Sequence, residues 1–574
     1  MSVRNFFLLC VTALLIAQPL HAQSEARIKV VSPGVDRLKE DLKFLVELSP
    51  TPALKKQWAK TLDPLIDSFA QGLDPAKPFR VDLVFGKTEL GYEMHFPLGQ
   101  LQGRNGFLEN LKGFGYPNKE LSKVLFELQQ GTKKNLKTVG FLRDANKYAS
   151  IAPTKEVIPA NMPNPITPDL LAYLAKGYDV AAEMKNDPKD KVGMAARLAN
   201  FKALRKQLEA GLIFKRDEDK SEFELRKLSA VNNLDEAERF VVETESLTVN
   251  WITDIVAKKG RGELSFSAIP GTGLQASAQL LAANPSYFAN VKPPAKPAVT
   301  GRLNFAIDPL RAGHLKSFYK AIRPVLAKQL DGLPSLKDAG QKAAAKQAGD
   351  LLIDMLDAGI AVGALDGCMD VTDAGGGKHT LLFGIRSANG KVADQIIDLF
   401  STIWPGFEIK LNVVAVAGTS LHTVTLPAAR LPRFQEFFPG ESVIHVATSK
   451  EAVWFAIGAT AQADLTVAIN AAAGPAPAMA DPVVAYFSAN MTKLVGLLEA
   501  LEPDRVEATG PKTPAQKERE KIRNLAEQAV KDCEPWLTSE LKRNGNVIEG
   551  TLDVTECALK FVGTVIADFS KQFD

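Results

Sequence analysis

Cysteine and histidine are scarce in this chain. Among 574 residues there are four cysteines and six histidines. Cys10 and His21 lie in an N-terminal segment that we expect to be removed, which leaves three thiols and five imidazoles. Three thiols exclude a full disulfide framework but allow one bridge. Cys533 and Cys557 flank one predicted hairpin, so they are the pair that we expect if a bridge forms; the alternative is three buried thiols, with Cys368 as the third.

The remaining histidines do not form a metal-binding pattern. They are His95, His314, His379, His422 and His445. None has a second histidine or cysteine at the close spacing that zinc sites use, so we predict no metal, and no other motif predicts a cofactor. Three of the five, His95, His422 and His445, alternate with apolar neighbours on predicted strands, and we expect these three to face solvent.

A strong net charge is also lacking. The chain has 69 basic and 66 acidic residues, a formal net charge of +3. This balance gives no electrostatic reason to expect a nucleic-acid partner. After the N-terminal segment no apolar run reaches the roughly 20 residues that a membrane-spanning helix needs. The most apolar stretch, 459–484, is interrupted by Asp464, Asp481 and several prolines.

The first two dozen residues have the order of a secretory signal peptide. Arg4 precedes an apolar run from Phe6 to Ala17, and Pro19 and small residues follow. We predict a signal peptide over 1–22 with cleavage after Ala22; the alternative is cleavage after Ser24. The segment predicts export to the periplasm or the extracellular space, where little nucleoside triphosphate is met.

Four short motifs approach functional signatures without matching them. The segment Gly375 to Thr380 lacks the first glycine and the Ser or Thr of a phosphate-binding loop. The run Gly271 to Ala276 has dinucleotide-type spacing, but Pro270 occupies its turn and no acid follows near 293. Gly418 to His422 lacks the second glycine of a nucleophile elbow. The acids at 217–219 and Glu222 lack EF-hand spacing, and we interpret them as a solvated turn.

Alternating and helical patterns along the chain predict an α+β fold of two similar-sized halves. Each half has antiparallel hairpins packed against helices. A proline-rich linker at 290–301 separates an N-terminal domain, 27–289, from a C-terminal domain, 302–574. The two halves have parallel layouts, so they are a candidate for a divergent duplication; the alternative is two unrelated domains.

Several segments carry local signals of a single element. We expect helices over 106–128, 144–151 and 450–457, and a strand over 222–228. Asn544-Gly545 is the strongest two-residue hairpin signal and joins the predicted strands 536–541 and 547–554. Thr513 begins a predicted capped helix.

The sequence therefore leads to a non-catalytic hypothesis with two alternatives. The leading one is an exported binding or structural protein of the cell envelope or secreted space, with a partner of unknown identity. The first alternative is a hydrolase whose active site is assembled from distant residues. The second is a carrier of an apolar ligand or lipid, with a cavity lined by strand faces such as Phe79, Val81, Leu83 and Met94.

Overall fold

A computed structural model of the chain describes residues 26–85, 90–132, 135–216, 218–427, 437–475, 482–494 and 533–569, together with Leu497, Asn524 and Val530. The predicted signal peptide with both cleavage candidates, Ala22 and Ser24, lies outside the described residues. Most of the helix predicted to begin at Thr513 also lies outside them.

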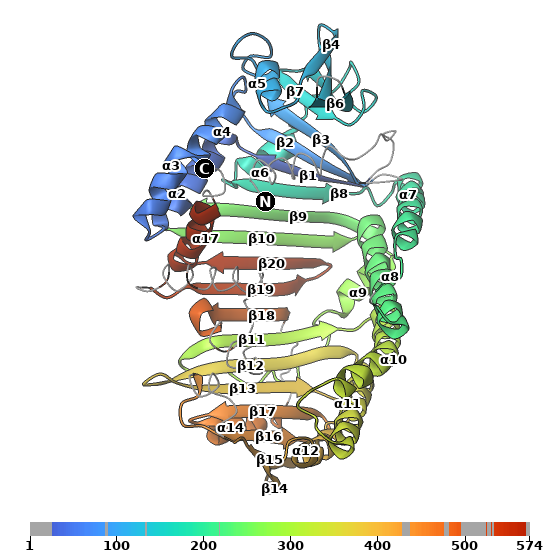
Figure 1. The fold of residues 1–574 in the computed structure, drawn as a ribbon, viewed down its shortest axis with the longest axis vertical. Coiled ribbons are helices and arrows are strands. Elements are labelled where there is room, and N and C mark those ends of the chain that lie inside the picture. Colours follow the sequence, from blue (N-terminus) through green and yellow to red (C-terminus); the bar gives the residue numbers. More distant parts are fainter. Residues whose placement is uncertain are drawn as a thin grey trace.

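Within the described residues, twenty strands form one antiparallel sheet that runs the length of the molecule (Figure 1). The first half of the chain supplies β1 (Ala26–Ser32), β2 (Phe79–Phe85), β3 (Leu90–Pro97), β4 (Asn118–Ser122), β5 (Leu125–Thr132), β6 (Asn135–Ala145), β7 (Tyr148–Ala152), β8 (Val180–Lys185), β9 (Thr244–Asp254) and β10 (Lys259–Ala268). The second half supplies β11 (Pro297–Ala306), β12 (Ala364–Gly375), β13 (Lys378–Arg386), β14 (Glu408–Val416), β15 (Thr419–Thr425), β16 (Val443–Thr448), β17 (Ala452–Gly458), β18 (Val483–Asn490), β19 (Trp536–Asn544) and β20 (Val547–Val554).

The strand order is the same in both halves. In the first half the order is β4-β5-β6-β7-β3-β2-β1-β8-β9-β10. In the second half it is β14-β15-β16-β17-β13-β12-β11-β18-β19-β20. Each strand of the first half thus corresponds to the strand numbered ten higher. The halves join edge to edge, because β10 pairs with β20.

Helices flank the sheet along the ends of its strands (Figure 1). One group contains α2 (Val35–Leu48), α3 (Pro52–Lys60), α4 (Leu62–Ala70) and α17 (Glu556–Phe569). The group at the opposite strand ends contains α7 (Lys191–Ala210), α8 (Lys220–Glu243), α9 (Gly273–Leu280), α10 (Pro309–Asp331), α11 (Ala339–Ile360) and α12 (Val392–Ile403). The remaining helices are α5 (Phe107–Gly113), α6 (Pro168–Leu174) and α14 (Ala461–Ala472). Among the described residues, no helix is both long and apolar enough to cross a membrane.

The fold is α+β, as the sequence predicts, but the proline-rich segment does not remain a connector. Pro297 already belongs to β11, and Val299 and Thr300 are buried in the sheet. One sheet runs through both halves, so the structure gives no separate cores on either side of 290–301. The division into two domains and the duplication stay predictions.

Four predicted elements are wrong. The segments 144–151 and 450–457 contain the strands β7 and β17, which pair with β3 and β13, and not helices. Short apolar runs fit either structure, and here long-range pairing decides. The segment 106–128 is helical only to Gly113 and then forms β4 and β5. The predicted strand at 222–228 lies inside α8, which begins at a capping box of Asp219 and Glu222.

Candidate functional site

A row of apolar residues crosses fifteen of the twenty strands without interruption. Directly opposed residues of antiparallel strands point to the same face of a sheet, so the registers define the row. From β6 to β17 it runs Leu142, Ile151, Met94, Val81, Val30, Ala182, Val249, Leu264, Gly550, Leu541, Ala485, Leu303, Gly367, Ile385 and Val453. We call the side of the sheet that carries this row the apolar face.

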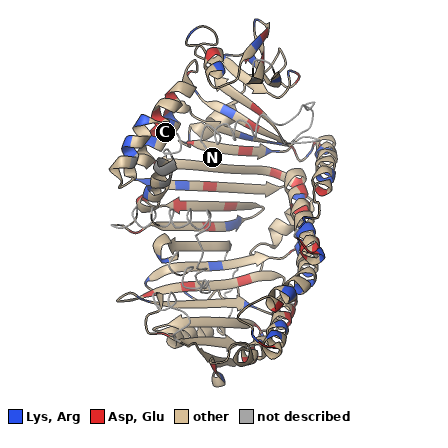
Figure 2. Cartoon of the chain, in the orientation of Figure 1, with Lys and Arg blue, Asp and Glu red and all other residues tan. Residues whose placement is uncertain are grey.

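The opposite side of the same central strands is polar. The matching row there contains Asn250, Glu263, Thr551, Glu540, Tyr486 and Arg302. Along each of the six central strands, polar and apolar residues therefore alternate, so that one face of this part of the sheet is polar and the other apolar. These strands are β9, β10, β20, β19, β18 and β11. Figure 2 shows that charged residues are frequent on the flanking helices and occur at scattered positions along the strands.

Coverage of the apolar face changes along the row. At the β6–β3 end Leu142, Ile151 and Met94 are 0%, 3% and 5% exposed, because Phe69 of α4 and Phe107 of α5 pack over them. In the centre Val249 is 43% and Leu303 39% exposed. Phe383 and Leu365, on the same face of β13 and β12, are 39% and 44% exposed. These partly exposed apolar side chains make this part of the apolar face a candidate interaction surface.

Helices border the exposed centre at both strand ends. At one end Phe44 and Leu45 of α2 and Leu559 of α17 pack on Trp251 and Leu552. At the other, α8 packs on Met184 and Leu247, and α9 packs on Phe266 and Ile548. The helices thus cover the ends of the central strands and leave their middles exposed.

The exposed centre offers no free strand edge to which a peptide strand could be added. Eight neighbouring strands form this part of the sheet, in the order β9-β10-β20-β19-β18-β11-β12-β13. Each has a partner strand on both sides, so its backbone groups are already hydrogen-bonded. A peptide cannot add to such strands through main-chain hydrogen bonds. Eight strands at about 4.8 Å spacing give the surface a length of about 34 Å.

The cavity that the sequence suggested for an apolar carrier is not at the expected positions. Met94 is buried, and Phe79 and Val81 pack in the same cluster as Phe69 of α4 and Phe107 of α5, whereas Leu83 is half-buried and lies outside that cluster. The expectation is therefore wrong for Phe79, Val81 and Met94, because alternation in the sequence identifies an apolar strand face but not whether a helix covers it; for Leu83 it stays a prediction.

A buried cluster of charged residues lies on the opposite, polar face of β1, β2, β3 and β7. It contains Arg27, Arg80, Asp82, Glu93, His95 and Ser150. The Arg80 guanidinium donates from Nε to Asp82 Oδ1 at 2.5 Å, and Arg27 Nη1 lies 2.6 Å from Glu93 Oε1. Burial lowers the pKa of His95 to about 4 and raises that of Glu93.

Asp82, Glu93 and His95 are the residues that could hold a metal ion, because their ligand atoms lie within 4.8 Å of one another. Two guanidinium groups already neutralise the two carboxylates, however, and His95 Nδ1 lies 3.0 Å from Ser150 Oγ. A divalent cation would have to displace both arginines. The donor set therefore fits an internal ion-pair network and does not fit a metal site.

His422 centres a second buried network, which includes residues of the near-match Gly418 to His422. Its Nδ1 accepts from the Asn412 backbone N–H at 3.2 Å, so its Nε2 carries the proton and faces Thr448 Oγ1 at 3.0 Å and Asp394 Oδ1 at 3.2 Å. Lys391 Nζ donates to Ser420 Oγ at 2.7 Å and lies 3.7 Å from Asp394.

This second network ties α12 to β15 and β16. A serine nucleophile needs a neighbouring base, but the neighbour of Ser420 is an ammonium group held close to a carboxylate. The network thus gives the hydrolase hypothesis no support, and that hypothesis stays untested.

The histidine predictions are partly wrong. His95 is 1% and His422 0% exposed, contrary to the expectation that they face solvent. His95 contacts Ser150 of β7, and His422 contacts Asp394 of α12; both partners lie outside the hairpin of the histidine, so local alternation does not identify them. His445 is half-buried and its pKa is lowered by burial. His379 is buried against the Phe437 ring, and His314 contacts Asp235 at 2.9 Å.

A surface hollow of about 670 Å³ lies beside the N-terminus of α2. Its lining includes Arg37, Glu40, Tyr178 and Asp179. Arg37 Nε donates to Asp179 at 2.9 Å, and its Nη2 lies 3.4 Å from the buried Asp41. Burial and the neighbouring Asp179 carboxylate raise the pKa of Asp41 to about 7. Sequence reasoning missed this carboxyl pair, whose members are 138 positions apart in the chain.

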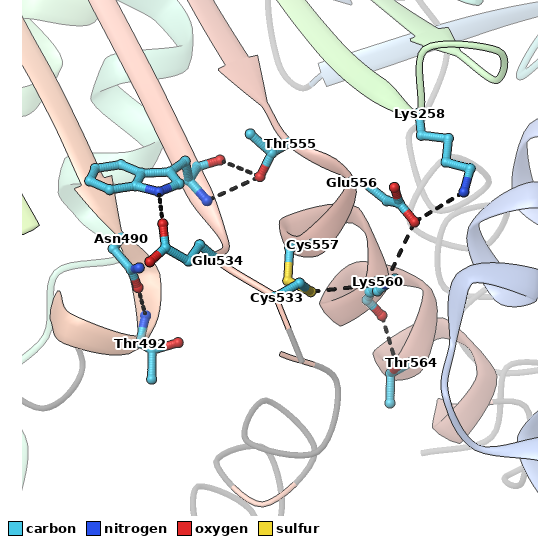
Figure 3. Close-up of a disulfide and its surroundings, with 11 residues drawn as sticks. Lys258, Asn490, Thr492, Cys533, Glu534, Thr555, Glu556, Cys557, Lys560 and Thr564 are labelled. Atoms are coloured by element: carbon cyan, nitrogen blue, oxygen red, sulfur yellow. Dashed lines mark hydrogen bonds and ion pairs between the residues drawn. A yellow bond between two sulfur atoms is a disulfide. The ribbon is translucent and has the colours of Figure 1, made fainter. Parts of the chain in front are cut away.

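Cys533 and Cys557 form a disulfide (Figure 3). It joins the segment before β19 to the first turn of α17, across the β19–β20 hairpin. Cys368 is a free, buried cysteine, and burial raises its thiol pKa to about 12.

The remaining near-matches have structural roles. Thr272 caps α9 through its side chain, and Gly375 to Gly377 form the β12–β13 turn. Asp219 caps α8 and pairs with Lys328, and Glu218 pairs with Arg226; Asp217 lies outside the described residues.

Comparison of the chain with known protein families, curated proteins and solved structures finds no match.

Proposed function

We propose that this chain is an exported, non-catalytic binding protein of the cell envelope or secreted space, and that its ligand is a lipid-like molecule whose alkyl chain lies on the apolar face. The carrying observation is the exposure of Val249, Leu303, Leu365 and Phe383 on one face of strands that each pair with a neighbour on both sides. This proposal unites the leading hypothesis from the sequence with its apolar-carrier alternative.

Burial of methylenes sets an upper bound on how tightly an alkyl chain can bind this surface. A methylene that is fully withdrawn from water contributes about 0.8 kcal/mol, so ten of them contribute at most about 8 kcal/mol, which corresponds to a dissociation constant of about 1 μM. A chain on an open face keeps water on its other side and loses translational freedom on binding, so we expect a dissociation constant well above this bound. Weak binding is compatible with a carrier that releases its ligand.

Export is part of the proposal. Its support is the signal-type order of the first 22 residues and the disulfide between Cys533 and Cys557, a bond typical of oxidising compartments. N-terminal sequencing of the mature protein should give a chain that begins at Gln23, or at Glu25 if cleavage follows Ser24. Recovery of Met1 from the periplasmic or secreted fraction would contradict cleavage.

We also propose that the two halves arose by duplication. The support is the shared order of ten strands in each half and the edge-to-edge junction through β10 and β20. On this view each half contributes strands to the exposed centre, β9 and β10 from the first and β11, β12, β13, β18, β19 and β20 from the second.

Binding is tested with a fluorescent long-chain fatty acid titrated into the delipidated protein. Val249→Asp places a charge in the exposed row and should weaken binding at least tenfold. Val256→Asp is the matched control, because Val256 is 94% exposed and lies in the turn after β9. Equal binding by both variants and the wild type, or no binding by the wild type, would reject the apolar face as the site.

A further inference from the structure

Arg543 is the one charged side chain among the paired residues that the registers place on the apolar face of β9, β10, β20, β19, β18 and β11. It lies opposite Ile548, which is in turn opposite Phe266. Leu541, two residues earlier on the same face of β19, belongs to the central part of the apolar row, which we call the exposed row. Alternate residues of a strand are separated by about 7 Å, so the guanidinium lies within reach of a ligand on that row.

The contacts of Arg543 leave its charge unneutralised. Its Nη1 donates to the Gln279 carbonyl at 2.6 Å, at the C-terminal end of α9. Within the part of the chain that the structure describes, no carboxylate forms an ion pair with it. A guanidinium carries five N–H donors, and one contact to a carbonyl uses one of them.

The other face of the same strands shows the contrast. Arg261 is ion-paired with Glu263, and Lys542 with Glu540. Arg302, also on that side, pairs with Asp370. These three cations of the polar face have acidic partners in the protein, whereas the single cation of the apolar face has none among the described residues.

We infer that Arg543 binds the anionic head group of an amphiphile whose alkyl chain occupies the exposed row. This inference rests on the proposed function and adds a ligand class: a long alkyl chain with one carboxylate or phosphate group at its end. A guanidinium matches both oxyanions through paired N–H donors. The apolar face would contact the alkyl chain of such a molecule, and Arg543 at its border would bind the anionic group.

The test compares head groups at constant chain length. Dodecanoate, dodecyl phosphate and dodecanol are titrated at pH 7.5 against the fluorescent fatty acid bound to the full chain. The wild type should bind both anions at least tenfold more tightly than the alcohol. The two anions distinguish a carboxylate source from a phosphate source.

Variants assign the effect to Arg543. Arg543→Gln keeps a donor for the Gln279 carbonyl and should reduce the affinity for the anions to that for the alcohol, leaving the alcohol unchanged. Arg543→Lys should retain most of the preference. Arg261→Gln changes the net charge equally on the other face and should leave all three affinities unchanged.

The ways in which the inference can fail are distinguishable. If the wild type binds the anions and the alcohol equally, the head-group inference is overturned while the proposed function stands. Equal weakening of all three ligands by Arg543→Gln would assign Arg543 to supporting α9 and would also overturn it. If the wild type binds none of the three, the proposed function itself fails.

Discussion

The same apolar row is a core at one end of the sheet and a surface in its centre. Leu142 and Met94 lie under α4 and α5, whereas Val249 and Leu303 lie between helices that cover only the strand ends. The strand residues are of the same kind in the two regions. The difference therefore comes from the chain segments that connect the strands. At the buried end these segments place helices over the row, whereas in the centre their helices lie beside it.

The opposite face shows the converse arrangement. Where the row is buried, the back of β2 and β3 carries the internal ion pairs of Arg80 and Asp82 beneath other chain segments. Where the row is exposed, the back of β10 and β20 carries charged and hydroxyl side chains such as Glu263 and Thr551. The closed end thus has a core on both sides of the sheet, whereas the centre has one partly exposed apolar face and one polar face.

The largest expected effect tests this contrast with two identical substitutions in one row. Leu142→Ala should destabilise the protein by about 2–5 kcal/mol, because the side chain is fully buried and its removal leaves a cavity. Leu303→Ala should cost about 1 kcal/mol, because Leu303 is already 39% exposed and its removal leaves no closed cavity. Chemical denaturation of both variants gives the two free energies. Equal losses would break the comparison and show that the centre of the row is covered in solution.

Much of this contrast is out of reach of the sequence. Local alternation predicts most strands of the row, and the Asn544-Gly545 turn predicts the hairpin that carries Leu541 and Arg543. The row itself depends on pairings such as Leu264 with Gly550 and Leu303 with Ala485, which join segments about 180 to 290 residues apart. No local pattern contains that register.

The errors have the same origin. Local patterns predict helices at β7 and β17 because five to seven apolar residues carry too little periodicity to separate the two structures. They predict that His95 and His422 face solvent because alternation identifies a face but not its cover. Asp41 and Asp179 can be recognised as a pair only once α2 and β8 are placed side by side.

A second prediction concerns the disulfide of the central region. The bond between Cys533 and Cys557 closes a loop with a sequence separation of 24 and holds α17 beside the exposed strands. Replacing both cysteines with serine should lower the free energy of unfolding by about 3 kcal/mol. A reducing agent should destabilise the wild type similarly and leave the double variant unchanged. Cys368→Ser is the control for thiol chemistry elsewhere. If reduction abolishes ligand binding while the secondary structure is unchanged, the exposed centre depends on the position of α17.

The smallest expected effect concerns α2, which borders the exposed centre. Burial and the neighbouring Asp179 carboxylate raise the pKa of Asp41 to about 7, whereas an unfolded aspartate titrates near 3.8. Between these values the folded chain holds a proton that the unfolded chain has released, so stability should fall as pH rises from about 4 to about 7. Asp41→Asn removes this dependence and should stabilise the protein by about 2 kcal/mol more at pH 8 than at pH 5.

Glu40→Gln on the same helix is the matched control for Asp41→Asn, because the Glu40 side chain is 63% exposed and its substitution should add no such pH dependence. Thermal unfolding of the three proteins across pH 4–8 makes the measurement. Parallel curves for wild type and Asp41→Asn would mean that Asp41 is ionised in the folded protein throughout. The border of the exposed centre would then be held by charge pairing with Arg37 and not by a shared proton, and α2 would respond to salt instead of pH.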